Sequence, residues 1–573
     1  MNFKKVKEIL LFILVNATFL TGAALFISTV YDLQFSKSEY FQNQALSYRE
    51  RVEVLEAARG SIYDRNLNVI SSSVQSYNIG IRPNEVSEKE ELSEVLSLFL
   101  DMEENKILSE LESRNSYFYI KRNVDFEIGK EIKSWNYKGL YPELSSKRIL
   151  HSNSLQNIVG RVDPDNNGIE GLELYYDTLL TGRNGELRYE AAPNGSIIPQ
   201  GEISTIQPVH GDDIILSIDG DLQYLSENLC AQALSETKAY NCSVVFANAL
   251  SGEIIISAEK KSPETENFNI NLISGRANYE PGSALKIFTI GSAIENNLIQ
   301  ATTTFEVDDQ IEIINGSCAI NYKGKDKGCF HDFLKHEKYI LSVKEIIERS
   351  SNVGTSLATQ SSDIKDIEEF LKRFGFSEKT GIELSGETRG GFTEYNTCKT
   401  CLSSLSIGYS IDVSQYQMVK AYSIIANGGK NVDLTLTRGI SNNKSSIEII
   451  SESTAMKLKE LLINVVEGKN GTGKSLRMDN YTIGGKTGTS RTHIEGIGYS
   501  NSRFNTSFTG FIETDEGPVV GSVLLWGAEI SPRSEYVTGG STAAPIFKTI
   551  VSYLVPGEWW IFLKKFKFSM IWI

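Results

Sequence analysis

The sequence lacks the excess of basic residues that nucleic-acid binding requires. Its 57 lysine and arginine residues are outnumbered by 72 aspartates and glutamates, which gives a net charge of −15 at pH 7. A protein that neutralises phosphates needs a basic face, and no arginine-rich motif is present to provide one. We therefore do not expect nucleic acid as a partner.

Histidine is also scarce, with five residues in the chain. No histidine has a sequence context that makes it the base of a serine–histidine–aspartate triad. His331 and Asp332 are adjacent, which by itself does not bring them to a nucleophile, and we interpret them as a loop pair. The sequence therefore offers no histidine-based triad.

One long uncharged stretch occurs near the N-terminus. Residues 9–31 carry no charge and are long enough to cross a bilayer as a helix. Three lysines precede the stretch, so the positive-inside rule places residues 1–8 in the cytoplasm and the remaining chain outside. A cleaved secretory signal is the alternative, although its apolar region is usually shorter. Both interpretations export the rest of the chain.

Only six cysteines are present, and in an exported chain they make disulfides possible. One Cys-x-x-Cys spacing is typical of redox or zinc sites, but no thioredoxin-like βαβ pattern surrounds it. We favour a disulfide or free thiols, because a single spacing signal supports zinc. The zinc alternative would use Cys318, Cys329, His331, Cys398 and Cys401. Cys230 lies in a helical pattern and Cys242 beside a strand, so both are expected to pack in the core.

Changes in composition divide the exported chain into three parts. In residues 32–207 short strand-like runs alternate with polar and glycine-punctuated segments, which predicts a β-rich pedestal or dimerisation-like domain. The pattern changes near Pro208, and residues 208–555 are expected to form a second, larger domain. Residues 556–573 hold three of the five tryptophans together with three lysines, which suits a membrane interface. A cloning or reading-frame artefact is the alternative for this tail.

The larger domain is expected to be α+β, with an antiparallel sheet flanked by helices. Two apolar runs around Leu250-Ser251-Gly252 indicate a hairpin, and three later strand patterns with short connections indicate a meander. The expected strands are 213–218, 243–249, 253–258, 481–489, 505–513 and 518–526. The expected helices include 221–238, with Leu222, Leu225, Leu229 and Ala233 on its buried face, and a closing helix through Leu554 capped by Ser541-Thr542.

A nucleophile candidate lies in this domain at Ser283. Pro281-Gly282 form a turn that leads into an apolar helical pattern, which places Ser283 near a helix N-terminus. Lys286 lies at i+3 on the same face, so its amine can reach the hydroxyl. The positive end of the helix dipole favours a developing alkoxide and disfavours an ammonium, which is how a serine becomes a nucleophile and an amine its base.

Two further motifs follow in the chain. Ser350-Ser351-Asn352 comes directly after a helical pattern at 343–348. Lys486-Thr487-Gly488 is the only Lys-Thr-Gly sequence in the chain and lies on a predicted strand. Each motif alone is weak, since Ser-x-x-Lys also occurs at Ser235 and Ser257. In this order and local structure, the three together are specific.

The three motifs resemble the signature of penicillin-binding proteins and serine β-lactamases. Over nearly its whole length the chain resembles the class B penicillin-binding proteins, and among them the cell-division peptidoglycan D,D-transpeptidases (penicillin-binding protein 3 type). The single N-terminal span matches that family. By the same resemblance, residues 208–555 are the expected transpeptidase domain. Further family-like segments are 59–66, 168–173, 279–283, 406–409 and 538–547.

The resemblance implies a role for each motif residue. Ser283 would attack the penultimate D-alanine of a stem peptide and form an acyl-enzyme, while Lys286 takes its proton. Ser350 would relay a proton to the leaving amine, and Asn352 would bind the substrate backbone. Backbone N–H groups of Ser283 and Thr489 would form the oxyanion hole. The residues that would bind the substrate carboxylate are Lys486, Thr487, Gly488 and Thr489.

The resemblance also implies partners and a location. The expected partners are peptidoglycan stem peptides, covalently binding β-lactams, the lipid bilayer through residues 9–31, and other division proteins including a glycosyltransferase. No metal or cofactor is needed, and the expected location is the cell inner membrane with a periplasmic catalytic domain. The alternatives are an elongation-type transpeptidase, a D-Ala-D-Ala carboxypeptidase or β-lactamase-like hydrolase, and a non-catalytic division scaffold.

Residues 468–475 match the P-loop pattern Gly-x-x-x-x-Gly-Lys-Ser. A P-loop must open a helix long enough to cross back over the sheet. Here a predicted strand begins at Tyr481, which leaves room for barely one turn. We therefore interpret the match as a flexible glycine loop and not as a nucleotide site.

Overall fold

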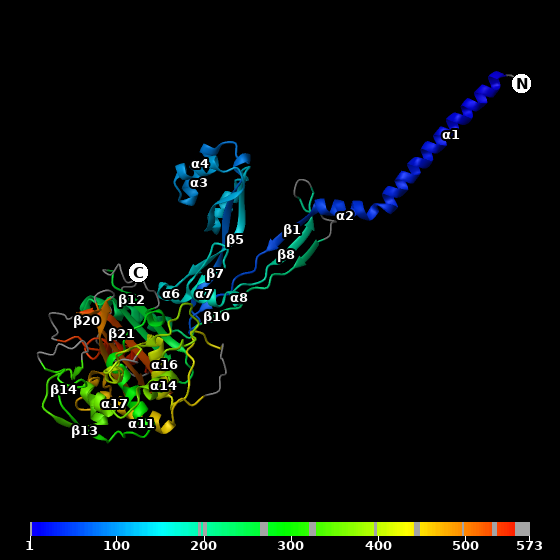
Figure 1. Ribbon diagram of the computed structural model, residues 1–573. Coiled ribbons are helices and arrows are strands. Elements are labelled where there is room, and N and C mark those ends of the chain that lie inside the picture. Colours follow the sequence, from blue (N-terminus) through cyan, green and yellow to red (C-terminus); the bar gives the residue numbers. More distant parts are fainter. Residues whose placement is uncertain are drawn as a thin grey trace. The chain divides into compact units, whose positions relative to one another are not determined.

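A computed structural model describes residues 3–192, 196–198, 203–263, 273–319, 328–394, 398–439, 447–494, 498–529 and 536–555. The chain forms two compact units, Met1–Arg59 with Thr181–Asp212, and Gly60–Leu180 with Asp213–Ile573 (Figure 1). The aromatic-basic tail at 556–573 lies outside the described residues.

The first unit contains the apolar N-terminal helix. Helix α1 (Phe3–Tyr31) continues through a π-helical turn, η1 (Asp32–Ser36), into α2 (Ser38–Arg49). Within the described chain, Phe3–Ser36 is the one helix long and apolar enough to span a membrane. An antiparallel three-stranded sheet of β1 (Glu50–Leu55), β8 (Gly185–Glu190) and β9 (Ile203–Ile206) completes the unit.

The second unit begins with a smaller sheet in the order β10-β2-β3-β4, with β5 also paired to β3. Its strands are β2 (Ile62–Tyr63), β3 (Val69–Ile81), β4 (Phe118–Asp125), β5 (Leu140–Leu150) and β10 (Ile214–Ile215). Helices α3 (Lys89–Leu100), α4 (Glu104–Ser113) and α5 (Phe126–Ser134) share one apolar core with this sheet. The 168–173 segment holds a buried ion pair, in which Arg148 Nε donates to Glu173 Oε1 at 2.7 Å.

A chain of short elements links this sheet to the catalytic part. These elements are η3 (Asn153–Leu155), α6 (Gln156–Val159), β6 (Arg161–Val162), β7 (Gly168–Glu170), α7 (Gly171–Tyr175) and α8 (Asp177–Leu180), whereas η2 (Pro83–Glu85) lies between β3 and α3.

The catalytic part is built on a five-stranded antiparallel sheet in the order β12-β11-β21-β20-β19. Its strands are β11 (Asn241–Asn248), β12 (Ile254–Lys261), β19 (Ile483–Ile494), β20 (Gly498–Ile512) and β21 (Val519–Glu529). The predicted hairpin and the predicted meander are both confirmed. Strand β19, which carries Lys486, lies at the edge of the sheet.

Alternate residues of β11 divide the apolar core between the two faces of this sheet. Val244 and Phe246 pack with α9 (Gly220–Thr237) and α18 (Ala543–Leu554). Val245 and Ala247 belong to the larger core with α11 (Lys286–Glu295), α16 (Gln415–Ala426) and α17 (Glu452–Glu467). This period of two is what a strand buried on both faces requires.

The remaining elements of this part are short helices, helical turns and two-stranded pairs. The helices and helical turns are α10 (Ile273–Arg276), η4 (Gly282–Leu285), α12 (Val343–Arg349), α13 (Asn352–Ala358), α14 (Ile364–Arg373), α15 (Cys401–Ser406) and η5 (Lys474–Leu476). The strands pair as β13 (Thr304–Val307) with β16 (Tyr339–Ser342), β14 (Gln310–Glu312) with β15 (Cys329–His331), and β17 (Gly391–Phe392) with β18 (Ile411–Asp412).

Helix α9 is rotated from its expected orientation. Its buried side chains are Gln223, Ser226, Cys230, Ala233 and Leu234, whereas Leu222, Leu225 and Leu229 are half-buried. Gln223 forms two hydrogen bonds with the backbone of Ser257 on β12, at 2.9 and 3.0 Å. These bonds, together with the Cys230–Cys242 disulfide, hold a partly polar face of α9 against the sheet.

Two smaller predictions differ from the structure. The strand expected at 213–218 is only the two residues of β10. Helix α18 begins at Ala543 with Thr542 before it, but Thr542 makes no side-chain capping bond and donates its hydroxyl to the Thr538 carbonyl.

All six cysteines are paired, as Cys230–Cys242, Cys318–Cys329 and Cys398–Cys401. Cys230 and Cys242 are fully buried in the apolar core, as expected, and their disulfide also joins α9 to β11. The zinc alternative is not supported, because disulfide sulfurs cannot act as thiolate ligands. No group of three His, Cys, Asp or Glu residues suited to a metal occurs in the described part of the chain.

Candidate active site

Ser283 lies in a tight turn packed against the edge strand β19. The chain enters as the 3-10 turn η4, and the α-helix proper begins only at Lys286. Gly282 has a φ of +53°, and its N–H donates to the Gly408 carbonyl at 3.0 Å. A Cβ on Gly282 would lie 2.8 Å from the Thr489 carbonyl oxygen, so only glycine fits. The turn therefore presents a half-buried Ser283 beside Thr489.

Residues of β19 also lie very close to the turn that carries Ser283. A Cβ on Gly488 would lie 2.8 Å from the Pro281 carbonyl oxygen and 3.3 Å from Ala284 Cβ. Ser490 Oγ donates to the Glu280 carbonyl at 2.7 Å. The backbones at Ser283 and Thr489 thus lie next to each other, as an oxyanion hole shared between them requires.

Lys286 is fully buried one turn after Ser283. Its amine donates to the Ser350 carbonyl at 2.6 Å and to Asn352 Oδ1 at 2.7 Å. Burial lowers the pKa of Lys286 to about 7, although the charge of Asp332 acts in the opposite direction. A large fraction of the amine is therefore neutral near pH 7, as a general base must be.

Ser350 occupies a left-handed backbone conformation between two helices. Its φ is +60°, it follows the last residue of α12, and Ser351 then caps α13 by accepting the Gly354 N–H. A non-glycine residue in this region carries a steric cost, which is common at functional sites. Through this conformation the Ser350 carbonyl contacts Lys286, and the Ser350 hydroxyl accepts from Lys486 at 2.7 Å.

Lys486 is also fully buried, on β19. Besides Ser350, its amine donates to the Thr487 carbonyl at 3.2 Å. Burial, reinforced by the charge of Lys286, lowers the pKa of Lys486 well below its ordinary value. The positive charge expected here for carboxylate capture is thus disfavoured until a counter-charge arrives.

The threonines beside Lys486 are fixed by neighbouring loops. Thr487 Oγ1 donates to Thr472 Oγ1 at 2.9 Å, and Thr489 Oγ1 accepts the Gly539 N–H at 3.2 Å. In the described part of the chain, no hydrogen bond involves the Ser283 hydroxyl. The three sequence motifs are thus brought together around Ser350, with Ser283 at the open end.

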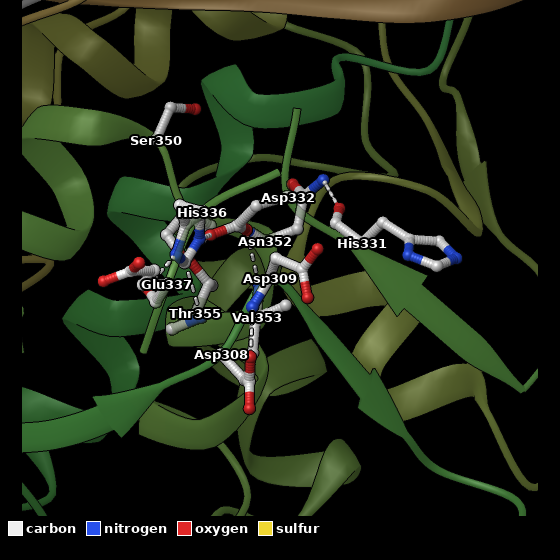
Figure 2. A network of polar contacts seen from close by, with 12 residues as sticks. Asp308, Asp309, His331, Asp332, His336, Glu337, Ser350, Asn352, Val353 and Thr355 are labelled. Atoms are coloured by element: carbon white, nitrogen blue, oxygen red, sulfur yellow. Dashed lines mark hydrogen bonds and ion pairs between the residues drawn. The ribbon is translucent and has the colours of Figure 1, made fainter. Parts of the chain in front are cut away.

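Asp332 and His336 also belong to this region, and the sequence did not indicate either. Asp332 does not pair with the neighbouring His331 side chain but contacts Ser351, Asn352, Val353 and His336 (Figure 2). The sequence held only an indirect signal for Asp332, which is that α13 has no acidic residue in its own first turn. A negative charge is favourable at a helix N-terminus, whichever part of the chain supplies it.

The P-loop match is a structural loop. In residues 468–475 only the single 3-10 turn η5 begins, at Lys474, and β19 follows at Ile483. Thr472, within this loop, contacts Thr487 beside Lys486. The segment therefore supports the catalytic strand and opens no helix of the kind that a P-loop requires.

Comparison with known families gives two matches that together cover most of the chain. Residues 242–552 match the penicillin binding protein transpeptidase domain, and residues 54–216 match the penicillin-binding protein dimerisation domain.

Individual relatives are similar over nearly the full length. Penicillin-binding protein PbpB of Mycobacterium tuberculosis is 26% identical, across 95% of this chain and 84% of its own. Peptidoglycan D,D-transpeptidase FtsI of Buchnera aphidicola is 27% identical, across 91% of this chain and 90% of its own. Among solved structures, penicillin binding protein 3 of Mycobacterium tuberculosis in complex with aztreonam has a TM-score of 0.63 at 22% identity, covering 88% of this chain and 96% of that one.

The transpeptidase match contains every motif residue of the site, from Ser283 to Thr489, and the dimerisation match precedes it. With this domain order and this arrangement of Ser283, Lys286, Ser350 and Lys486, the chain belongs to the class B penicillin-binding proteins, a family of peptidoglycan D,D-transpeptidases.

Proposed function

We propose that the chain cross-links peptidoglycan stem peptides through an acyl-enzyme on Ser283, and that it does so at the division septum. The observation that carries the chemical part is the position of Ser350. Its carbonyl and its hydroxyl contact the two buried lysines, 2.6 Å from Lys286 and 2.7 Å from Lys486. This arrangement joins a base, a proton relay and a carboxylate-binding group in one hydrogen-bonded set beside a serine.

In the acylation step, the Ser283 oxygen attacks the carbonyl carbon of the penultimate D-alanine as the Lys286 amine takes the hydroxyl proton. The resulting oxyanion is stabilised by the N–H groups of Ser283 and Thr489. Collapse breaks the peptide C–N bond, and the leaving amine of the terminal D-alanine receives a proton through the Ser350 hydroxyl. Free D-alanine departs and Ser283 carries an ester.

In the transfer step, an amine from a neighbouring stem peptide attacks the ester carbon. Lys286 accepts the proton lost by that amine, and Ser283 leaves as the alkoxide and regains a proton. The products are a new peptide bond and a free Ser283. A β-lactam amide would enter the same first step and remain as a stable ester on Ser283.

We further propose that α1 anchors the chain in the inner membrane with the catalytic part in the periplasm. The apolar span and the preceding Lys4, Lys5 and Lys7 support this orientation. The septal role and division partners, including a glycosyltransferase, rest on the sequence resemblance to the division type. Depletion should then produce filaments, whereas rounded cells would indicate a role in elongation.

Labelling with a fluorescent penicillin tests the nucleophile. We expect a covalent adduct on the wild type and none on Ser283→Ala. Ser235→Ala is the matched control, because Ser235 also begins a Ser-x-x-Lys sequence but is exposed on α9. An adduct that survives Ser283→Ala contradicts the assignment. Hydrolysis of the adduct within seconds would favour a β-lactamase-like hydrolase, and absence of any adduct would favour a non-catalytic scaffold.

A further inference from the structure

The N-terminus of α13, which carries Asn352, is held by a carboxylate from a distant part of the chain. Asp332 follows strand β15, and its side chain is only 8% exposed. Asp332 Oδ1 accepts the backbone N–H groups of Asn352 at 2.6 Å and Val353 at 3.0 Å. Asp332 Oδ2 accepts the Ser351 hydroxyl at 2.7 Å. One carboxylate therefore fixes three successive residues next to Ser350.

His336 holds this carboxylate from the other side. Its Nε2 lies 3.0 Å from Asp332 Oδ2, and its Nδ1 lies 2.7 Å from the Glu337 carbonyl oxygen (Figure 2). A carbonyl and a carboxylate both only accept hydrogen bonds, so both ring nitrogens must donate. The geometry thus requires an imidazolium, and a neutral ring would leave one nitrogen lone pair facing an oxygen.

The surroundings of His336 agree with this charge. Its ring stacks on Tyr339 of β16 with 4.7 Å between centroids, and the Arg349 guanidinium of α12 lies over the same tyrosine. Burial alone would lower the pKa of His336. The Glu337 carbonyl, Asp332 and the nearby Asp309 outweigh burial, and the pKa is raised.

Asn352 carries the effect of Asp332 to the catalytic amine. Its backbone N–H is held by Asp332, its side-chain amide donates to the His331 carbonyl at 2.8 Å, and its Oδ1 accepts from Lys286. Both Lys286 acceptors, Asn352 Oδ1 and the Ser350 carbonyl, therefore lie in or beside the turn that Asp332 fixes. The negative charge of Asp332 also acts directly on Lys286, against the effect of burial.

We propose that Asp332, clamped by a protonated His336, is a positioning residue for acyl transfer by Ser283. It holds the turn at residues 350–353 and thereby keeps both hydrogen-bond acceptors of the Lys286 amine in place beside the turn that carries Ser283. This inference rests on the proposed function, because it assigns a role in the Ser283 reaction.

The test is the rate of penicillin acylation as a function of pH in three full-length proteins. Asp332→Asn keeps the size and one acceptor oxygen but removes the charge. Asp308→Asn is the control, because Asp308 is an exposed carboxylate in the turn after β13 and bonds only to the adjacent Asp309 N–H among the described contacts. The wild type establishes that Ser283 is acylated at all.

For Asp332→Asn we expect the plateau rate to fall on the order of 10- to 100-fold, the loss typical of a misplaced catalytic group. The acid limb should also move to lower pH, because the charge that raised the Lys286 pKa is gone. Asp308→Asn should match the wild type in both respects. A slow variant whose acid limb stays in place would show a merely structural role and overturn the proposal.

The variant His336→Gln tests the proposal even if Asp332→Asn does not fold. The wild-type rate should fall at alkaline pH as His336 loses its proton, and this alkaline fall should be absent in His336→Gln. Wild-type rate and pH profile in both variants would overturn the inference and leave the proposed function intact. A wild type that penicillin does not acylate would instead overturn the proposed function itself.

Discussion

Two lysine amines hydrogen-bond to one serine, Ser350, at the centre of this site. Burial disfavours the charged form of both amines. Lys286 and Lys486 are fully buried and hydrogen-bond to opposite ends of Ser350. A like charge at short range in a poorly solvated place is unfavourable, so the empty site carries less charge than two lysines would have in water. This is the state that the proposed function needs, with Lys286 as the base and Lys486 as the group that pairs with the substrate carboxylate.

The rate of acylation should follow the protonation of Lys286. Its pKa of about 7 means that the amine is protonated and inactive below that pH and neutral above it. We expect the penicillin acylation rate to rise about tenfold per pH unit below the pKa, and to level off above it until the alkaline fall caused by loss of the His336 proton begins. Stopped-flow or quenched labelling between pH 5 and 8 measures this, and a rate that falls over this range would contradict the role of Lys286.

Binding of a substrate carboxylate should draw a proton into the site. The pKa of Lys486 is lowered by burial and by Lys286, and a bound carboxylate supplies the opposite charge that restores it. We expect net proton uptake when Ser283→Ala binds a peptide ending in D-Ala-D-Ala. Calorimetry in buffers of different ionisation enthalpy measures the uptake.

The same measurement on a Ser283→Ala/Lys486→Met double variant is the control, and uptake should disappear there. Equal binding heats in all buffers for Ser283→Ala would show that Lys486 is charged before the substrate arrives.

At the scale of elements, local sequence patterns were a reliable guide. The hairpin β11–β12 and the meander β19–β20–β21 were predicted from apolar runs with short connections, and helix α18 from its start signal. The three motifs of the site were predicted from their residue types, their order in the chain and the local pattern around each.

Features that depend on long-range contacts were not predictable in this way. The rotation of α9 follows from Gln223 bonding to Ser257 and from the Cys230–Cys242 disulfide, neither of which leaves a periodic signal. Asp332 reaches α13 from twenty residues away in the chain. Only the fold shows that the acid at this helix N-terminus is the residue that follows β15.

The packing of α15 behind the nucleophile turn gives a test at this scale. Gly408 follows α15 with a φ of +88°, and a Cβ there would lie 1.8 Å from the Gly282 carbonyl oxygen. Gly408→Ala must therefore displace the turn that carries Ser283. We expect penicillin acylation to slow on the order of 10- to 100-fold, since small displacements of a nucleophile are costly.

Gly428→Ala is the control that separates the effect of this clash from the effect of backbone strain alone. Gly428 has a φ of +87° but no atom within 4 Å of an added Cβ. We expect this variant to lose some stability, about 1 kcal/mol, while acylating at the wild-type rate. Equal acylation rates in Gly408→Ala and Gly428→Ala would show that the Gly282 contact is unimportant.

At the scale of the whole molecule, the anchor and the catalytic machinery are separate. Every motif residue lies in the second compact unit, whereas α1 belongs to the first. The net charge of −15 does not oppose the proposed capture of a carboxylate, because the charge that would pair with it forms locally, at a buried lysine, as the carboxylate binds. Membrane attachment and chemistry should therefore be separable by deletion.

Removal of residues 1–36 should abolish attachment without abolishing chemistry. The second unit holds its own apolar core clusters, so its fold does not need the span. We expect the shortened protein to leave the membrane fraction, and to be acylated by penicillin within about twofold of the full chain. Retention of the protein in washed membranes would show a second point of attachment.

Mass spectrometry of the penicillin-treated chain tests the assignment of Ser283 as the acylated residue. We expect one added penicillin mass per protein, located by peptide mapping on the fragment that contains Ser283, and no added mass in Ser283→Ala. An adduct on any other residue, or an unchanged adduct in Ser283→Ala, would contradict it.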